Sequence, residues 1–430
     1  MPVRRLLAAA CLLPLALPPA GAAEEPGAAP DPLRLSGFAT LGLTHSDNAD
    51  AGLAFSHSQK QPVYDGLSAK LDSVLGLQLD WQAAPDTSLA VQGVARAGSR
   101  LEPELRMAYL RQQLSQDVAL RLGRIRSPLY FDSDVAEIGY AYLMVRQPMP
   151  LYAQVNGAAA IDGADLQWRH AAGNAAFLLQ ASVSSTSYQR KLAVYNSETQ
   201  IKWRKVRSLA LNVNLPYLTA RASRTWIGDY ELHGINTDQL NDGLNRTSAS
   251  LQLAGLPALA RQVSSFINPL NGPLTYSSAG FDSTVNDWRF MGEWTQTRSY
   301  KALVGNYRGY QLTTAYNLRD CTPYFSVARL DRRSDALDTS ALAATGVRPD
   351  LDRGVAILKG VLDAAGRYSN LSTRSVSLGV RYDFQENKAF KLQYDWLKTP
   401  NAQTPGIFEV THLPIRNRVS LISATLDMVF

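Results

Sequence analysis

The segment Asp287–Arg298, with the sequence DWRFMGEWTQTR, decides the fold of this chain. Its residues alternate strictly between apolar or small side chains on one face and polar side chains on the other. The first face holds Trp288, Phe290, Gly292 and Trp294, and the second holds Arg289, Glu293 and Thr295. A period of two over this length predicts a β-strand with one apolar and one wet face.

The same alternation recurs in other long segments, including Thr373–Phe384 and Ala389–Lys398. These segments approach the ~9–11 residues with which a tilted strand crosses a bilayer. Strands of a soluble β-sandwich, the alternative, are typically about five or six residues long. Beyond the N-terminal segment, no stretch has the ~20 apolar residues of a membrane helix. The sequence therefore favours a transmembrane barrel over a sandwich.

The pattern predicts about sixteen strands, and fourteen and eighteen are the alternatives. By residue number they are 35–44, 67–82, 87–98, 104–113, 117–125, 162–170, 174–184, 205–214, 217–227, 274–283, 287–299, 307–318, 322–332, 372–384, 387–398 and 417–430. Aromatic residues near their ends are typical of the interfacial girdles of such barrels. These are Tyr109, Trp168, Trp226, Trp288, Tyr316, Tyr382, Tyr394 and Trp396.

Short connectors such as Ala84–Asp86 and Gln385–Glu386 alternate with long ones such as 126–161 and 333–371. This arrangement is typical of an all-β, transmembrane antiparallel β-barrel with short periplasmic turns and long extracellular loops. In Thr247–Phe266, apolar residues recur at helical spacing. They predict one short helix inside a long extracellular loop, packed on the barrel rim or folded inward, and a periplasmic plug helix is the alternative.

The N-terminus predicts export. Arg4 and Arg5 precede the apolar run Leu6–Leu17, and small residues follow it before Glu24. That order is typical of a cleaved secretory signal peptide. The expected divisions are a signal peptide at 1–23, a periplasmic lead at 24–34 and an outer-membrane β-barrel at 35–430. The predicted location is the outer membrane of a Gram-negative bacterium.

Composition and motifs argue against several function classes. The 43 Lys and Arg residues exceed the 37 Asp and Glu residues by a net charge of +6, spread along the chain, so we expect no nucleic-acid partner. The 5 histidines have no metal-ligand spacing, and no hydrolase or nucleotide-binding motif occurs. We therefore expect no enzyme activity, no metal and no cofactor. An outer-membrane hydrolase with a Ser/His pair on the outer wall is the alternative from the enzyme class.

Two regions carry a family resemblance. The last strand, Val419–Phe430, alternates and ends in an aromatic residue, and the strand Val118–Arg126 is followed by Pro128 and an acidic, aromatic loop. Both resemble Gram-negative outer-membrane porins, chiefly the general trimeric porins and in part the phosphate-selective porins. The resemblance implies a homotrimer, contact with outer-membrane lipid, and recognition of Phe430 by the barrel assembly machinery. It also implies that loop 126–161 folds inward and narrows the lumen.

On that resemblance, carboxylates of the loop face basic side chains of the wall. The candidate constriction residues are Arg121, Arg124, Arg126, Asp132, Asp134, Glu137 and Arg146. The period-two register adds the pore-wall candidates Arg96, Arg106, Arg169, Arg289, Arg381 and Lys391. Arg124 is out of phase with the lumen face, so it needs a bulge or a strand end to point inward.

These features together predict a porin for passive diffusion of small hydrophilic solutes. A barrel of this size encloses water, and rings of charge at its narrowest point select solutes. Because arginine outnumbers acidic residues on the predicted wall, we expect a mild preference for anions. The alternative within the same fold is a substrate-specific channel with an arginine-lined anion-binding site.

Overall fold

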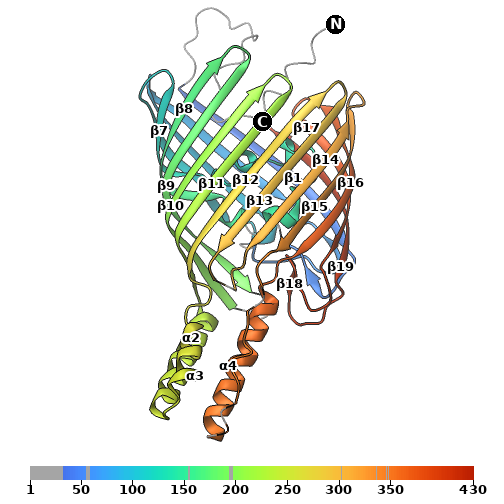
Figure 1. The fold of residues 1–430 in the computed structure, drawn as a ribbon. Coiled ribbons are helices and arrows are strands. Elements are labelled where there is room, and N and C mark those ends of the chain that lie inside the picture. The colour runs from blue at the N-terminus through green and yellow to red at the C-terminus, as the bar shows by residue number, and fades with distance from the viewer. Residues whose placement is uncertain are drawn as a thin grey trace, which may run out of the picture.

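The computed structural model describes residues 32–54, 59–153, 155–192, 197–301, 303–335, 337–344, 346 and 348–430. The predicted signal peptide and most of the predicted lead lie outside these residues. Over the described part, the chain forms an upright barrel of steeply tilted strands with helices projecting from one end (Figure 1).

Sixteen long antiparallel strands, all among the described residues, form the barrel, each paired with the next. They are β1 (Leu33–Ser46), β4 (Val74–Ala84), β5 (Thr87–Arg96), β6 (Pro103–Gln113), β7 (Val118–Arg126), β8 (Ala160–Ala172), β9 (Ala175–Leu192), β10 (Ser197–Leu215), β11 (Leu218–His233), β12 (Gly272–Val285), β13 (Trp288–Ser299), β14 (Tyr307–Tyr316), β15 (Cys321–Arg332), β16 (Thr373–Gln385), β17 (Lys388–Lys398) and β19 (Arg418–Val429). The barrel closes where β1 pairs with β19, from Phe38 opposite Val429 to Ser46 opposite Leu421. Each expected strand overlaps one of these, so the predicted count of sixteen is confirmed.

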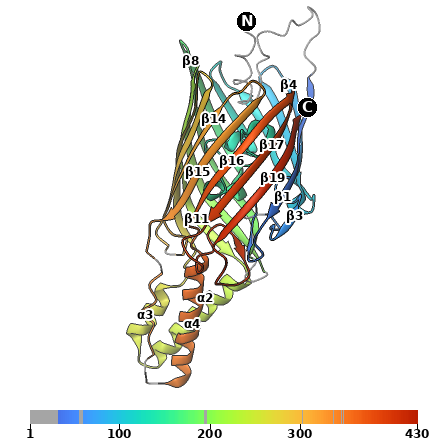
Figure 2. The ribbon, with the colours of Figure 1, turned by 90° about the vertical axis from the view of Figure 1, so that its right-hand side faces the viewer.

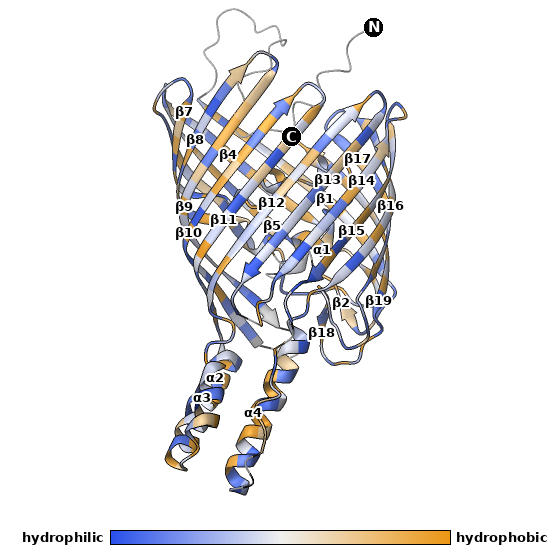
Figure 3. Ribbon diagram, viewed as in Figure 1, coloured by the Kyte–Doolittle hydropathy of each residue, from blue (hydrophilic) through white to orange (hydrophobic). Residues whose placement is uncertain are grey.

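The alternation read from the sequence separates the two faces of the wall. On β17, Lys391, Gln393 and Asp395 point inward and are buried. Phe390, Leu392 and Tyr394, between them, are 42%, 45% and 45% exposed on the outside. An apolar outer band around a polar interior is typical of a transmembrane barrel. Figure 3 shows the resulting mixture of hydrophobic and hydrophilic positions along each strand.

The two ends of the barrel differ. Tight turns, such as Pro85–Asp86 and Glu386–Asn387, join the strands at the end where the C-terminus lies, which we call the turn end. Longer connections gather at the opposite end, which we call the loop end. Three short strands, β2 (Ala51–Gly52), β3 (Gly66–Ser68) and β18 (Glu409–Val410), lie within the longer connections. The predicted alternation of short and long connectors is confirmed.

The loop end carries more helix than the sequence predicted. The expected helix near 247–266 is two helices, α2 (Ile235–Leu253) and α3 (Pro257–Ser265), because Pro257 starts a new helix. A third helix, α4 (Pro349–Tyr368), comes from the connection after β15. The three share a core of their own, which includes Leu251 and Leu358. Figures 1 and 2 show them projecting away from the barrel, so neither predicted position, on the rim or folded inward, is correct.

None of these helices, nor any other helix within the described residues, has the length and apolar character needed to cross a membrane.

A bulge in β6 corrects one aromatic prediction. Met107 pairs with Gln92 of β5 while Leu105 pairs with Gly93, so Arg106 is an extra residue in β6. The bulge shifts the phase of the rest of β6 by one position. Tyr109 therefore faces the lumen, 5% exposed, and is not part of an outer girdle.

Candidate pore constriction

The connection between β7 and β8, residues 127–159, folds into the barrel. It contains α1 (Met149–Tyr152), which lies inside the wall in Figure 3, and three one-turn 3₁₀ helices. The turns are Ser133–Val135, Gly139–Ala141 and Asn156–Ala158. Leu129, Tyr130, Leu151 and Tyr152 of this inward loop pack against inward-facing residues of β10, β11 and β12. The loop therefore crosses the lumen, as the resemblance implied.

Glu137 forms the most highly charged contact between the loop and the wall. Its carboxylate pairs with Arg96 of β5, with Arg106 of β6 at 3.3 Å and with Arg126 of β7 at 3.7 Å. The glutamate side chain is 1% exposed. Burial by itself would raise the pKa of Glu137, but the three arginines together lower it to about 2. Three predicted basic residues and one predicted acidic residue thus meet in one cluster.

Arg146 makes a second cluster, with partners from the segment before β4 and from β17 and β19. Its guanidinium donates to Asp72 at 2.8 and 2.7 Å, to Asp395 of β17 at 2.6 Å and to Ser423 of β19 at 2.6 Å. The side chain is 3% exposed. Burial acts to lower the pKa of Arg146, but the neighbouring carboxylates of Asp72 and Asp395 raise it overall. This arginine is therefore a fixed positive charge neutralised by two carboxylates.

Arg381 and Lys391 hold the loop through its backbone. Arg381 donates to the carbonyl oxygens of Tyr140 at 2.7 Å and Tyr142 at 2.6 Å. Lys391 donates to the carbonyl oxygens of Gly139 at 2.7 Å and Met144 at 3.0 Å. Lys391 also pairs with Asp427 at 3.0 Å, and both side chains are fully buried. Two predicted wall residues thus bind the loop directly.

The acidic residues before Glu137 meet the wall at β11 and β13. Asp134 pairs with Arg221 of β11 at 2.6 Å. Burial tends to raise the pKa of Asp134, but Arg221 lowers it overall. Burial, reinforced by repulsion from Asp282, raises the pKa of Asp132 to about 6. Arg289 of β13, a predicted wall residue, pairs with that same Asp282 at 2.5 Å.

Arg124 was predicted at the constriction, and this prediction is wrong. β7 shows no bulge in its pairing with β6 or β8, so the phase of Arg124 is unchanged. Its guanidinium pairs with Asp162 of β8 at 2.7 Å, and the two side chains are 36% and 48% exposed on the outer face. Arg121, three residues earlier, does face the lumen, where it pairs with the buried Asp165 at 2.5 Å.

Basic charge without an acidic partner lies nearer the turn end. Arg111 of β6 stands directly opposite Arg121 of β7, and both face the lumen. Arg169 of β8, a predicted wall residue, lies beside them and is repelled by both. Among the described residues, neither Arg111 nor Arg169 forms an ion pair. Arg111 was not predicted, because a regular β6 would point it outward. Only the bulge at Arg106 turns it toward the lumen.

The sequence did not single out the carboxylates that neutralise the wall. Asp72, Asp165, Asp395 and Asp427 bind Arg146, Arg121 and Lys391, as described above. Glu293 of β13 accepts from the Tyr152 hydroxyl and from the Phe131 amide at 3.1 Å. The available signal was their phase, because Asp395 and Glu293 sit on the polar faces of alternating strands.

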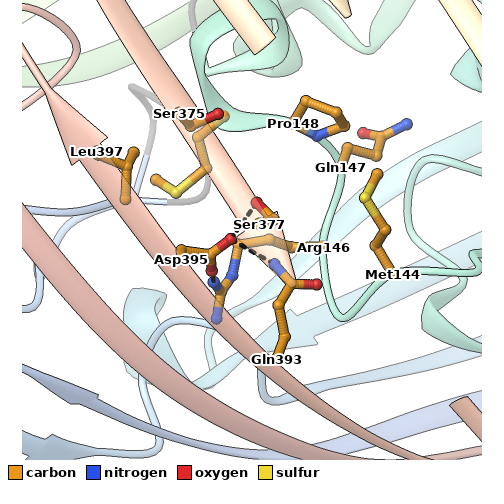
Figure 4. A pocket seen from close by; sticks show the side chains of 10 residues that line it. Met144, Arg146, Gln147, Pro148, Ser375, Ser377, Gln393, Asp395 and Leu397 are labelled. Atoms are coloured by element: carbon orange, nitrogen blue, oxygen red, sulfur yellow. Dashed lines mark hydrogen bonds and ion pairs between the residues drawn. The ribbon is translucent and has the colours of Figure 1, made fainter. Parts of the chain in front are cut away.

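A cavity remains between the loop and two strands of the wall, β16 and β17. In Figure 4 the side chains of Arg146, Gln393 and Asp395 converge beside Ser377, with Met144 and Pro148 of the loop opposite. Ser377 donates to Asp395 at 2.5 Å. The cavity holds about 10 Å³, which is room for about one water molecule. Along this wall the loop is therefore packed almost closed.

Within the described residues, no group of three or more His, Cys, Asp or Glu side chains is placed to hold a metal ion.

Comparison with known proteins gives a likeness in structure only. No protein-family model matches the chain, and no curated protein matches it. The outer membrane channel DcaP of Acinetobacter baumannii is 11% identical with a TM-score of 0.54, covering 93% of this chain and 97% of that chain. OmpF of Salmonella typhi, in complex with daunomycin, is 9% identical with a TM-score of 0.51, covering 93% and 97% respectively. At these identities the likeness is one of fold.

Proposed function

We propose, from the sixteen-stranded porin fold of this chain, that it is an outer-membrane channel for passive diffusion of small hydrophilic solutes. One observation carries the proposal: a barrel large enough to hold water has a polar inner wall and an apolar outer band. The inward loop is the part of the channel that limits the size of solutes. The membrane is the outer membrane of a Gram-negative bacterium, reached through the predicted signal peptide.

The proposed preference is for anions. The residues to which we now assign it lie nearer the turn end than the loop residues that the sequence predicted. Most arginines near the loop have a carboxylate partner, as Glu137 and Asp165 show. Arg111 and Arg169 keep uncompensated positive charge on the lumen wall. In a narrow, low-dielectric passage such charges raise the local concentration of anions.

A second candidate is a channel specific for one anionic solute. The observation that favours it is the close fit of the loop, which leaves about 10 Å³ beside β16 and β17. A general pore needs a standing water-filled opening, whereas a specific channel can admit one solute past a packed loop. In this case the arginines near Glu137 would exchange that carboxylate for an anionic group of the solute.

Planar-bilayer recording of the purified protein tests both candidates. A general pore gives stepwise conductance that a series of small anions does not block, with a reversal potential favouring anions. A specific channel gives saturable block by one anion only. Absence of any conductance step would contradict the channel proposal as a whole, and cation preference would contradict the selectivity alone.

Two partner predictions are part of the same proposal. The porin resemblance predicts a homotrimer, which native mass measurement of the detergent-solubilised protein would detect. It also predicts that the assembly machinery recognises the last strand through Phe430. A Phe430→Ala variant should then reach the outer membrane in smaller amounts than the natural chain.

A further inference from the structure

Four basic residues occupy directly opposite positions on four neighbouring strands. Arg329 of β15 faces Arg374 of β16, Arg374 faces Lys398 of β17, and Lys398 faces Arg418 of β19. We call these four residues the basic row. Side chains at directly opposite positions are about 5 Å apart at their Cβ atoms, and like charges there destabilise a sheet.

The basic row lies on the outside of the barrel. Its members share the outward phase of apolar residues on the same strands: Val327, Leu378, Tyr394 and Ile422, which are 37%, 58%, 45% and 55% exposed. Arg329 pairs with Asp331 at 2.7 Å. Among the described residues, Arg374, Lys398 and Arg418 form no ion pair. The row therefore presents positive charge to whatever surrounds the barrel.

The height of the row matches the edge of the apolar band. About ten residues of strand separate it from the turn end. At ~3.3 Å per residue and a tilt of ~40°, this is a rise of about 25 Å, the height of the apolar band of membrane barrels. Trp396 lies just below the row, with the Arg374 guanidinium 5.9 Å from its ring. A positive row above an aromatic residue is suited to an anionic headgroup above acyl chains.

The strands that follow the row beyond β19, where the barrel closes, carry leucines instead. At a similar distance from the turn end, the outward residues of β1, β4 and β6 are Leu43, Leu75 and Leu105, each 47% exposed. Basic residues also point outward on β10 and β11, but Arg207 and Arg224 do not stand directly opposite each other.

We propose that the basic row binds the phosphorylated headgroup of a membrane lipid, whose acyl chains lie on Trp396 and the aliphatic residues below. The inference rests on the proposed membrane location and goes beyond the proposed channel. The negative charge of the phosphate offsets the repulsion between the three unpaired basic residues. Each phosphate oxygen can accept charge-assisted hydrogen bonds from two neighbouring strands at once.

Native mass spectrometry of the full chain in neutral detergent tests the proposal. The probes are dioleoyl phosphatidic acid and dioleoyl phosphatidylcholine, which share acyl chains but differ in headgroup charge. We expect phosphatidic acid to be retained at least about tenfold more strongly, with retention falling as salt is raised. Equal retention of the two lipids would overturn the proposal.

Paired substitutions locate the site. We expect Arg374→Gln with Arg418→Gln to weaken retention of phosphatidic acid by about tenfold. The control is Arg207→Gln with Arg224→Gln, which removes two exposed basic residues from β10 and β11, outside the row. An equal loss in both pairs, or no loss in the first, would overturn the proposal. Heat-dependent migration in gels would confirm that both variants fold as barrels.

Inorganic phosphate distinguishes a lipid site from a simple anion site. Millimolar phosphate should not displace phosphatidic acid, because the free ion lacks acyl chains to bury on the apolar band. Full displacement would show that the row binds any phosphate and would overturn the lipid assignment. The row variant should retain the conductance of the natural chain, so failure of this proposal differs from failure of the channel proposal.

Discussion

Glu137 of the inward loop and Arg96 of β5 form an ion pair inside the barrel, with side-chain exposures of 1% and 10%. The same carboxylate lies within 3.3 Å of Arg106 and 3.7 Å of Arg126. A single loop carboxylate therefore binds basic side chains from three consecutive strands. Loss of that carboxylate would leave all three arginines facing one another in the lumen.

The Glu137→Gln variant should release the loop from the β5–β7 wall. Removing one partner of a buried ion pair typically costs about 3–5 kcal/mol, because the remaining charge is left without compensation. We expect a larger and noisier single-channel conductance and faster proteolytic cleavage within 127–159.

Glu104→Gln is the matched control, since Glu104 contacts Arg106 at 2.9 Å but its side chain is 37% exposed. It should change neither conductance nor cleavage. Identical records from Glu137→Gln and the natural chain would show that this ion pair does not hold the loop.

The low pKa of Glu137 predicts the pH at which the loop loses its ion pairs with the wall. Its folded value of about 2 lies below the ordinary 4.5, so the stabilisation is complete above about pH 4.5 and is lost as the pH falls toward 2. The conductance increase expected of Glu137→Gln should therefore appear in the natural chain only near pH 2–3. Its appearance near pH 5 would contradict this assignment.

Asp132 predicts a separate effect near neutral pH. Burial raises its pKa to about 6, so its negative charge is lost as the pH falls from about 7 to about 5. Anion preference, measured as the reversal potential across a salt gradient, should rise over that interval. Asp132→Asn should show the higher preference at both pH values, and a natural pH response in this variant would refute the assignment.

Arg111 and Arg169 should set the anion preference. Replacing both with Gln removes the uncompensated charge of the lumen wall, so the reversal potential should move toward that of a neutral pore. Arg207→Gln, which alters an outward residue of β10, should leave the potential unchanged. An unchanged potential in the double variant would assign selectivity to other residues.

The helices at the loop end should fold and melt apart from the barrel. Leu251→Asp places a carboxylate in their shared core, where Leu251 is fully buried, and should cost several kcal/mol locally. Circular dichroism should lose helical signal while heat-dependent migration and conductance stay unchanged. Leu253→Asp, at a side chain 91% exposed, is the control and should keep the helical signal. Loss of barrel migration in Leu251→Asp would show that the two parts depend on each other.

The strands could be predicted from the sequence because lipid on one side and a wet lumen on the other enforce a period of two. Where a strand extends beyond the membrane, its outer face is no longer apolar, and there the predicted strand is too short. β9 continues to Leu192, beyond the predicted 184, and its outward residues Ser185, Ser187 and Gln189 are polar. α4 was missed although Leu351, Val355, Leu358 and Leu362 recur at helical spacing, because its segment was treated as a loop.

The candidate site could be predicted only in part. The period-two phase of the strands alone placed Arg121 and Lys391 in the lumen, and it also indicated that Arg124 points outward. The partners could not be predicted, because a contact such as Arg146 with Asp395 joins residues far apart in the chain. Likewise, the bulge at Arg106 depends on how β5 and β6 pair.

The helices at the loop end and the inward loop are different segments, so the surface that projects from the barrel is separate from the part that narrows the lumen. α4 has 20 residues, and at ~1.5 Å per residue it is about 30 Å long. In the proposed outer-membrane channel, an antibody or another cell-surface molecule would meet this projection first, while the passage of solutes would depend on a loop deep inside the wall. Sequence change at exposed positions such as Leu253 or Ile357 can alter the outline seen from outside without disturbing the route through the barrel.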